Sequence, residues 1–228
     1  PMMTHFFETK DGKRVVAAKG APEAIMNVSI LNDDEKKLIN EAIKSLAKVG
    51  YRLLGVAETE FSGSSFPETQ QELKFKFKGI VAFYDPPKSN IESVLKKFYS
   101  AGIEVKIITG DNADTTFAIA KQINFNGYEN AMSGEELVGL SDDELQKKVS
   151  VTSIFTRMFP EAKLKVINAL KANNQIVAMT GDGVNDGPAL KAAHIGIAMG
   201  KKGTEIAKQA ASLILVEDDL SKMVDAIA

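Results

Sequence analysis

From residue 74 to the end of the chain, short apolar segments alternate with helical segments, and this alternation limits the possible folds more than any other feature. The apolar segments have the length of strands and are IEVKIIT (103–109), QIVAMT (175–180), IGIAM (195–199) and SLILV (212–216). Strands that are apolar on both faces and joined by helices are typical of a parallel sheet covered on both sides. The sequence therefore predicts an α/β fold with a parallel sheet for this part of the chain.

Further elements of this part follow from local signals. We expect strands over residues 74–85, as one long strand or a strand pair, and over 151–158. The periodicity of apolar residues predicts helices over 89–99, 113–123, 187–193, 203–211 and 219–227. Another helix is expected to begin at Pro160, because proline is favoured in the first turn of a helix.

The first 60 residues predict an antiparallel arrangement. THFFET (4–9) and KRVVAAK (13–19) have the pattern of strands, and Asp11-Gly12 between them is a hairpin turn signal. Residues 33–49 have helical spacing, with acidic residues leading, and YRLLGVAE (51–58) predicts a further strand. The stretch Asp85-Pro86-Pro87-Lys88 is a candidate boundary. We therefore expect a first domain of residues 1–85 and a second of residues 86–228.

Composition excludes several classes of protein. The chain has 228 residues, 44% of them hydrophobic, so a sizeable core can form. The net charge is −2 with no basic stripe, which argues against a nucleic-acid partner. The absence of cysteine excludes disulfides and thiolate metal sites. Apolar runs fall short of the ~18 residues that span a bilayer, so we expect this part not to be inserted in a membrane.

Two expected strands end in the same three residues, Thr109-Gly110-Asp111 and Thr180-Gly181-Asp182. Ligands of such sheets bind beyond the carboxyl ends of the strands, so these residues should gather there together with Asp186. Thr109 and the following backbone N–H groups could donate to a phosphate group. Three carboxylates would repel a phosphate, so the pattern predicts a divalent cation such as Mg²⁺ between them.

Each of these residues has a second interpretation. Asp111-Asn112 could simply cap the next helix, and capping could account for one of Asp182 and Asp186, but not both. The glycines around them could serve a tight turn or the close approach of a ligand. GDGVND also resembles a dinucleotide-binding G-x-G-x-x-G loop, but Asp186 in the last position would face a pyrophosphate.

Three basic residues are also candidates. Lys163 lies one turn into the helix expected at Pro160, where it could neutralise a phosphoryl oxygen or an aspartyl group, or point into solvent. Lys19, followed by Gly20, Ala21 and Pro22, could bind a planar ring, or this could be a plain turn. Arg52 at the start of a strand is a possible phosphate partner.

Four motifs in a fixed order resemble the cytoplasmic part of a P-type cation-transporting ATPase. They are KGAPE (19–23), DPPK (85–88), ITGDN (108–112) and TGDGVNDGPALKAAHIGIAMG (180–200). KGAPE points to the calcium, proton and sodium/potassium branch. The resemblance implies that residues 1–85 are the C-terminal part of a nucleotide-binding α/β domain with antiparallel strands. It implies that residues 86–228 are a Rossmannoid, haloacid dehalogenase-like phosphorylation domain whose parallel sheet lacks its first strand.

The resemblance also implies residue roles. The residues implied to bind ATP are Lys19, Gly20, Arg52, Thr109, Gly110, Asp111, Arg157 and Lys163. The residues implied to take part in phosphoryl transfer are Thr109, Gly110, Asp111, Lys163, Asn185 and Asp186. Asp182 and Asp186 would bind Mg²⁺, and Asp85 and Lys88 would belong to a hinge between the domains. The family usually has alanine in place of Gly187 and aspartate in place of His194, so small effects are expected there.

The family's nucleophile, the aspartate of a D-K-T-G-T motif, does not occur in these 228 residues. Asp111 lies four residues before Thr115 but follows the Thr-Gly pair, and we interpret its segment as a helix cap. We therefore expect a soluble fragment that is inert by itself and that belongs to a pump, with calcium as the expected ion. Its partners would be ATP and the actuator and transmembrane domains, at the cytoplasmic face of a membrane.

Two alternative functions remain from the sequence, and one question of assembly. The chain could be a soluble haloacid dehalogenase-type phosphatase, although that class needs an N-terminal D-x-D pair, which is absent. It could be a non-catalytic nucleotide-binding module. The open edge of a sheet lacking a strand could also pair with a second copy, giving a homo-oligomer.

Overall fold

A computed structural model describes residues 2–63, 67–84 and 86–227. The chain divides into two compact units, residues 1–86 and 87–228. Asp85, one of the two expected hinge residues, lies outside the described residues.

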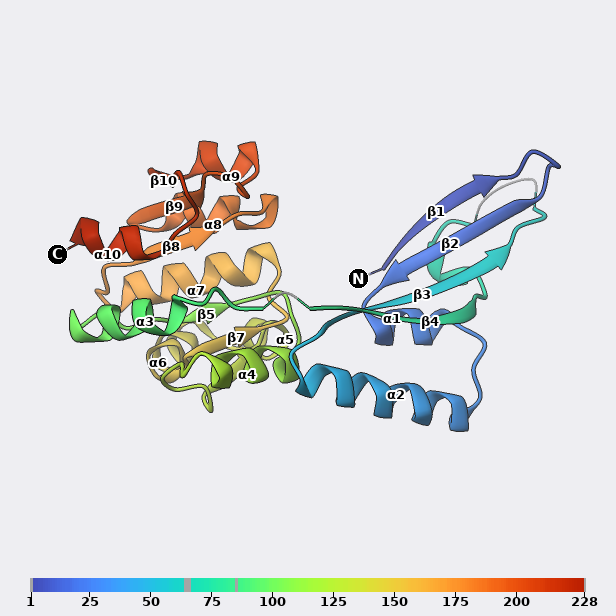
Figure 1. Ribbon diagram of the computed structural model, residues 1–228, viewed down its shortest axis with the longest axis horizontal. Helices are drawn as coiled ribbons and strands as arrows, with labels where there is room; N and C mark the ends of the chain where they lie inside the picture. Colours follow the sequence, from blue (N-terminus) through green and yellow to red (C-terminus); the bar gives the residue numbers. More distant parts are fainter. Residues whose placement is uncertain (1, 64–66, 85, 228) are drawn as a thin grey trace. The chain divides into compact units, whose positions relative to one another are not determined.

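The first unit is built on a four-stranded antiparallel sheet in the order β1-β2-β3-β4 (Figure 1). Its strands are β1 (Met2–Glu8), β2 (Arg14–Gly20), β3 (Arg52–Glu60) and β4 (Lys76–Phe83). The hairpin predicted at Asp11-Gly12 joins β1 to β2, and Gly12 has a φ of 79°, which glycine adopts without strain. Within residues 74–85, predicted as one long strand or a strand pair, Lys76–Phe83 form the single strand β4.

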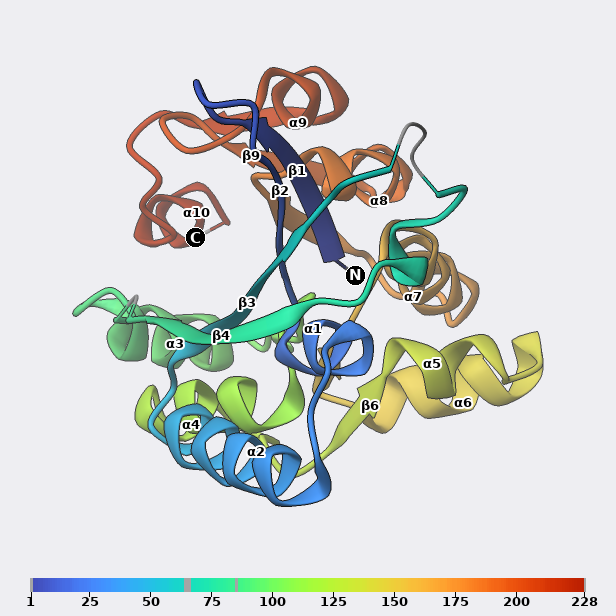
Figure 2. The same cartoon turned by 90° about the vertical axis from the view of Figure 1, so that its right-hand side faces the viewer.

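Two helices belong to this unit, α1 (Pro22–Val28) and α2 (Asp33–Lys48), and a 3₁₀ turn, η1 (Gln70–Glu72), precedes β4. Helix α1 lies against the sheet (Figure 2). Its residue Ile25 is fully buried in a cluster with Val16 of β2 and Ala57 of β3. The helix predicted over residues 33–49 is confirmed, and a capping box between Asn32 and Glu35 begins it. Its apolar face is only partly covered: Leu38 is 67% exposed, Ile39, Ile43 and Leu46 are half-buried, and Ala47 alone is buried. Helical spacing predicts the helix, but not what its apolar face packs against.

The second unit contains two three-stranded sheets in which every strand pair is parallel, in the orders β10-β9-β8 and β5-β7-β6. The strands are β5 (Ile107–Ile108), β6 (Ala131–Ser133), β7 (Ile154–Thr156), β8 (Ala178–Gly181), β9 (Ile195–Met199) and β10 (Leu213–Leu215). The predicted α/β class, with an antiparallel sheet first and parallel strands later, is confirmed.

Helices connect these strands. They are α3 (Ile91–Ser100), α4 (Ala113–Gln122), α5 (Gly134–Val138), α6 (Asp142–Val151), α7 (Pro160–Ala172), α8 (Gly187–Ala192), α9 (Glu205–Ala210) and α10 (Ser221–Ile227), with the 3₁₀ turn η2 (Val184–Asp186) before α8. Pro160 is the first residue of α7, as predicted. Among the described residues, no helix combines the length and the apolar character needed to cross a membrane.

Several predicted strands are shorter than expected, most of all those over residues 103–109 and 151–158. Of residues 103–109, Ile107 and Ile108 form β5 and pair with Ile154 and Phe155 of β7. Of residues 151–158 only Ile154–Thr156 pair, because α6 continues through Val151. A capping box between Ser141 and Glu144 begins α6, and the sequence analysis assigned no element to this stretch.

The two parallel sheets share helices on both faces. On one face a single core joins α7 to both sheets, with Phe155 of β7, Met179 of β8 and Ala198 of β9 in it. On the other face, Phe98 of α3 packs with Ile197 of β9, while its neighbour Leu95 packs with Ile154 of β7. The sheets therefore lie in one layer between two layers of helices, and β5 and β8 are the end strands of their sheets.

Candidate functional site

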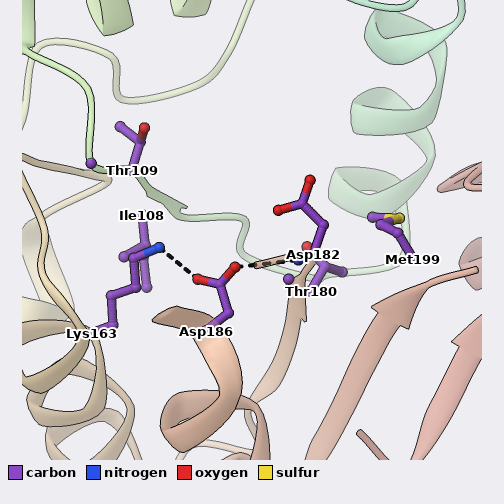
Figure 3. Close-up of a pocket in the computed structure, with 9 residues that line it drawn as sticks. Ile108, Thr109, Lys163, Thr180, Asp182, Asp186 and Met199 are labelled. Carbon is purple, nitrogen blue, oxygen red and sulfur yellow. Dashed lines mark hydrogen bonds and ion pairs between the residues drawn. The ribbon is translucent and has the colours of Figure 1, made fainter. Parts of the chain in front are cut away.

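An open cleft of about 310 Å³ lies at the carboxyl ends of β5 and β8 in the second unit (Figure 3). The residues that line it are Ile108, Thr109, Gly110, Lys163, Thr180, Gly181, Asp182, Asp186 and Met199. The two strands that end in Thr-Gly-Asp thus contribute to the same cleft. This is where ligands of parallel α/β sheets bind.

Lys163 points from the first turn of α7 into the cleft. Its Nζ lies 2.6 Å from Oδ1 of Asp186, and the two side chains are only 12% and 11% exposed. The structure shows that Lys163 reaches over the strand ends and does not point into solvent. The partner it has in the structure is a carboxylate of the cleft itself.

The other carboxylate oxygen of Asp186 organises the turn after β8. Oδ2 accepts hydrogen bonds from the backbone N–H groups of Asp182, at 3.2 Å, and Gly183, at 3.0 Å. A Cβ on Gly181 would lie 2.6 Å from Cβ of Asp186, so this close approach requires glycine. Asp186 is therefore the member of the Asp182/Asp186 pair that caps backbone donors.

Asp182 has a different environment. It is exposed, and in Figure 3 its carboxylate lies apart from that of Asp186. Its backbone oxygen accepts a hydrogen bond from Thr204 N–H at 2.8 Å, which fixes the main chain at this position. A carboxylate held this way is available to a ligand.

The opposite side of the cleft is a loop after β5. The Asp111 N–H donates to Thr109 Oγ1 at 3.1 Å, and the Met158 N–H donates to the Thr109 carbonyl at 2.9 Å. Asn112, not Asp111, caps α4, with its Oδ1 accepting from Thr115 N–H at 2.9 Å. Asp111 lies just beyond the residues that line the cleft.

Comparisons with known proteins agree with this geometry. A family model of haloacid dehalogenase-like hydrolases matches residues 8–194. The chain belongs to this family.

The curated relatives of this haloacid dehalogenase-like chain are cation pumps. It is 37% identical to a calcium-transporting ATPase of Saccharomyces cerevisiae, over 99% of this chain and 26% of the pump. It is 38% identical to a calcium-transporting ATPase of Bacillus subtilis, over 99% and 27%. It is 37% identical to the human calcium-transporting ATPase type 2C member 2, over 96% and 23%. The chain thus spans about a quarter of the relatives' length, and the resemblance to P-type cation pumps is confirmed.

The carboxylates of the haloacid dehalogenase-like chain do not form the three-membered cage that the sequence predicts. Among the described residues, no group of three or more His, Cys, Asp or Glu side chains is placed to hold a metal ion. Asp182 and Asp186 share the cleft, whereas Asp111 does not line it. The backbone around Asp111 is instead tied to Thr109 and Arg157.

The remaining predicted residues lie outside the cleft lining. Asn185 is exposed in η2, and Arg157 is exposed after β7 with a left-handed φ of 50°. Lys19, Gly20 and Arg52 belong to the first unit, on β2 and at the start of β3.

Three further residues line the cleft, and one expected hinge residue lies elsewhere in the second unit. Ile108 and Met199 line the cleft, but apolar residues at strand ends resemble core residues, so the sequence pattern does not mark them. Thr180 could be found from the repeated Thr-Gly-Asp. Lys88, expected in a hinge, donates from Nζ to the Asp218 carbonyl.

Proposed function

We propose that this chain is the nucleotide-binding and phosphorylation region of a P-type ATPase that couples ATP hydrolysis, through an aspartyl phosphate, to cation transport. The observation that carries the proposal is the arrangement of Lys163, Asp186 and Asp182 across one cleft from Thr109. Calcium is the proposed ion, because several relatives are named calcium-transporting ATPases. The partners would be the rest of the pump, on the cytoplasmic face of its membrane.

The cleft has the groups needed to hold a phosphoryl group. The Thr109 hydroxyl, the Gly110 backbone and the Lys163 ammonium all belong to residues that line it. In phosphoryl transfer most of the catalysis comes from positioning and from neutralising charge on the transferred group. Lys163 would spread that charge, and Asp186 would hold Lys163 in place.

The donor set also fits Mg²⁺. Asp182 and Asp186 give the lining two negative charges against the single positive charge of Lys163, so an anionic phosphoryl group requires a further cation. Mg²⁺ usually takes one or two carboxylates plus phosphate oxygens and waters, rather than an all-protein cage. Asp182 would be the main ligand, because Asp186 already accepts from Lys163 and two backbone N–H groups. When bound, the ion would supply charge neutralisation.

The nucleophile would come from a strand that contains the D-K-T-G-T motif, which these 228 residues lack. β5 and β8 are end strands whose carboxyl ends line the same cleft, and a parallel strand between them would place its own carboxyl end there. Its aspartate oxygen would attack the γ-phosphorus in line as the bond to the ADP oxygen breaks, and water would later hydrolyse the acyl phosphate. A second copy of this chain could also pair with the edges of β5 and β8, and this pairing remains a prediction.

The first unit would bind the nucleotide on the face of its sheet that α1 leaves uncovered. Lys19 is exposed, whereas the preceding residue Ala18 faces the other side of the sheet and is buried. Lys19 lies in register with Met3 of β1 and Val56 of β3. Arg52 lies on the same face as Val56, because strand residues two or four apart share a face. An apolar surface beside a lysine suits an adenine ring, and Arg52 would contact the phosphates.

Incubation of the chain with Mg²⁺ and γ-³²P-labelled ATP tests the proposal. We expect no acid-stable label on these 228 residues, and weak ATP binding that Lys19→Ala removes, as followed by NMR titration. Acid-stable label would show a nucleophile within the chain and contradict the proposal. Hydrolysis of p-nitrophenyl phosphate would favour the phosphatase alternative. ATP binding without any Mg²⁺-dependent response of the Thr109 and Asp182 amides would favour a non-catalytic module.

A further inference from the structure

Gly134, the first residue of α5, is buried directly behind the chain segment that follows β7. A Cβ added to Gly134 would lie 2.7 Å from the Arg157 carbonyl oxygen and 3.3 Å from a ring carbon of Phe159. The first contact is with backbone, so no side-chain rotation can relieve it. The position therefore requires glycine for close packing.

The segment Arg157–Phe159, here called the bracket, connects the loop after β5 to the start of α7. Arg157 N–H donates to the Asp111 carbonyl at 2.8 Å, and Met158 N–H donates to the Thr109 carbonyl at 2.9 Å. The Phe159 carbonyl accepts from the Lys163 N–H at 3.0 Å, so the bracket also begins α7. Its position sets how far Thr109 lies from Lys163.

Neither Gly134 nor the bracket can easily move away from the other. Ser133 pairs with Thr156 in the parallel β6–β7 ladder, so the residues that follow, Gly134 and Arg157, are held side by side. Ser133 also forms a capping box with Glu136, with its N–H 2.7 Å from Glu136 Oε2 and its Oγ 3.2 Å from the Glu136 N–H. Arg157 already has a left-handed φ of 50°, which is uncommon for a residue with a side chain.

We propose that Gly134 is a positioning residue of the candidate phosphoryl site: its missing side chain lets the bracket hold the Thr109 loop at the correct distance from Lys163. The role of the cleft rests on the function proposed above, whereas the packing of Gly134 against the bracket does not. A methyl group at this position would push the bracket toward residues 109–111 and widen or skew the cleft.

The test compares Gly134→Ala with Gly139→Ala in the whole chain. Gly139 ends the same helix, is exposed, has a helical φ of −74°, and would place a Cβ at an ordinary 3.6 Å from the Glu136 carbonyl. Gly134→Ala should shift the NMR amide signals of Thr109, Gly110 and Asp111, and Gly139→Ala should leave them in place. Binding of inorganic phosphate with Mg²⁺ should weaken by about tenfold in Gly134→Ala, since small displacements of positioned groups are costly.

A double variant supplies a rescue. Glu136→Gln weakens the capping box, so the first turn of α5 can withdraw, and Gly134→Ala/Glu136→Gln should return the residue 109–111 signals toward those of the parent chain. If Gly134→Ala does not fold, hydrogen exchange of the parent chain decides: the Arg157 and Met158 amides should exchange as slowly as core strand amides. Fast exchange there, or unchanged loop signals in a folded Gly134→Ala, would overturn the proposal. Absence of phosphate binding by the parent chain would count against the proposed function alone.

Discussion

Lys163 Nζ lies 2.6 Å from Asp186 Oδ1, and the two side chains, 23 residues apart in the sequence, are both largely buried. The pair holds the lysine at the cleft. Asp186 holds the lysine with one oxygen and the turn after β8 with the other. One carboxylate therefore connects the helix to the strand end that carries Asp182.

Replacing Asp186 by alanine should be strongly destabilising. The change leaves the Lys163 charge and two backbone N–H groups without the carboxylate, and breaking a buried ion pair in this way costs about 3–5 kcal/mol. Urea unfolding followed by circular dichroism measures the free energy of unfolding. A loss below about 1 kcal/mol, the level of an exposed pair, would show that the contact is not structural.

Replacing Asp182 by asparagine should separate binding from stability. Because Asp182 is exposed, the free energy of unfolding of the Asp182→Asn variant should stay within about 0.5 kcal/mol of the parent value. Mg²⁺-dependent binding of inorganic phosphate should be lost, because the remaining carboxylate is engaged by Lys163. Isothermal titration calorimetry measures that binding, with Asp142→Asn, at an exposed aspartate of α6, as the control. Unchanged Mg²⁺ dependence would rule out Asp182 as the main ligand.

Two glycines six residues apart should respond in opposite directions. Gly187→Ala should be neutral or stabilising by about 0.4–1 kcal/mol, because Gly187 has a helical φ of −49° and a Cβ would lie 3.5 Å from Ile206. Gly181→Ala should destabilise by about 1–3 kcal/mol, because its Cβ would meet that of Asp186. Thermal unfolding of both variants gives the comparison. Equal effects would show that the close approach at Gly181 is not required.

The carboxyl group of Asp218 should make stability depend on acid pH. Its burial raises the pKa, but backbone N–H groups of Lys201, Lys202 and Gly200 outweigh burial and hold the pKa below its ordinary value. A carboxyl whose pKa is lower in the folded state stabilises the fold above its unfolded pKa, and this contribution is lost as pH falls through the folded pKa.

Asp218→Asn should therefore lower the melting temperature at pH 7, since the amide nitrogen cannot accept a hydrogen bond. Asparagine tolerates the left-handed φ of 56° at this position, so the backbone should be unaffected. The difference from the parent chain should shrink as the pH is lowered below the ordinary range of an aspartate. A difference that is constant between pH 7 and acid would contradict the assignment.

Local sequence patterns predict much of the fold and part of the site. Pro160 begins α7 and places Lys163 one turn in, because proline's fixed φ suits a first turn. The two Thr-Gly-Asp segments end strands of parallel sheets, so Thr109 and Asp182 reach one cleft. These results depend on backbone preferences and burial within a few residues, which the sequence encodes directly.

Contacts between elements were decided by tertiary structure. The packing of α7 in the core it shares with β8 decides which carboxylate meets Lys163. The hydrogen bonds from the bracket to the loop after β5 keep Asp111 outside the cleft. The need for glycine at residue 134 arises from the register between β6 and β7. The exposure of Leu38 likewise depends on which other elements α2 packs against. Side-chain distances across elements are set by packing of residues far apart in the chain, and no periodicity in the sequence records those distances.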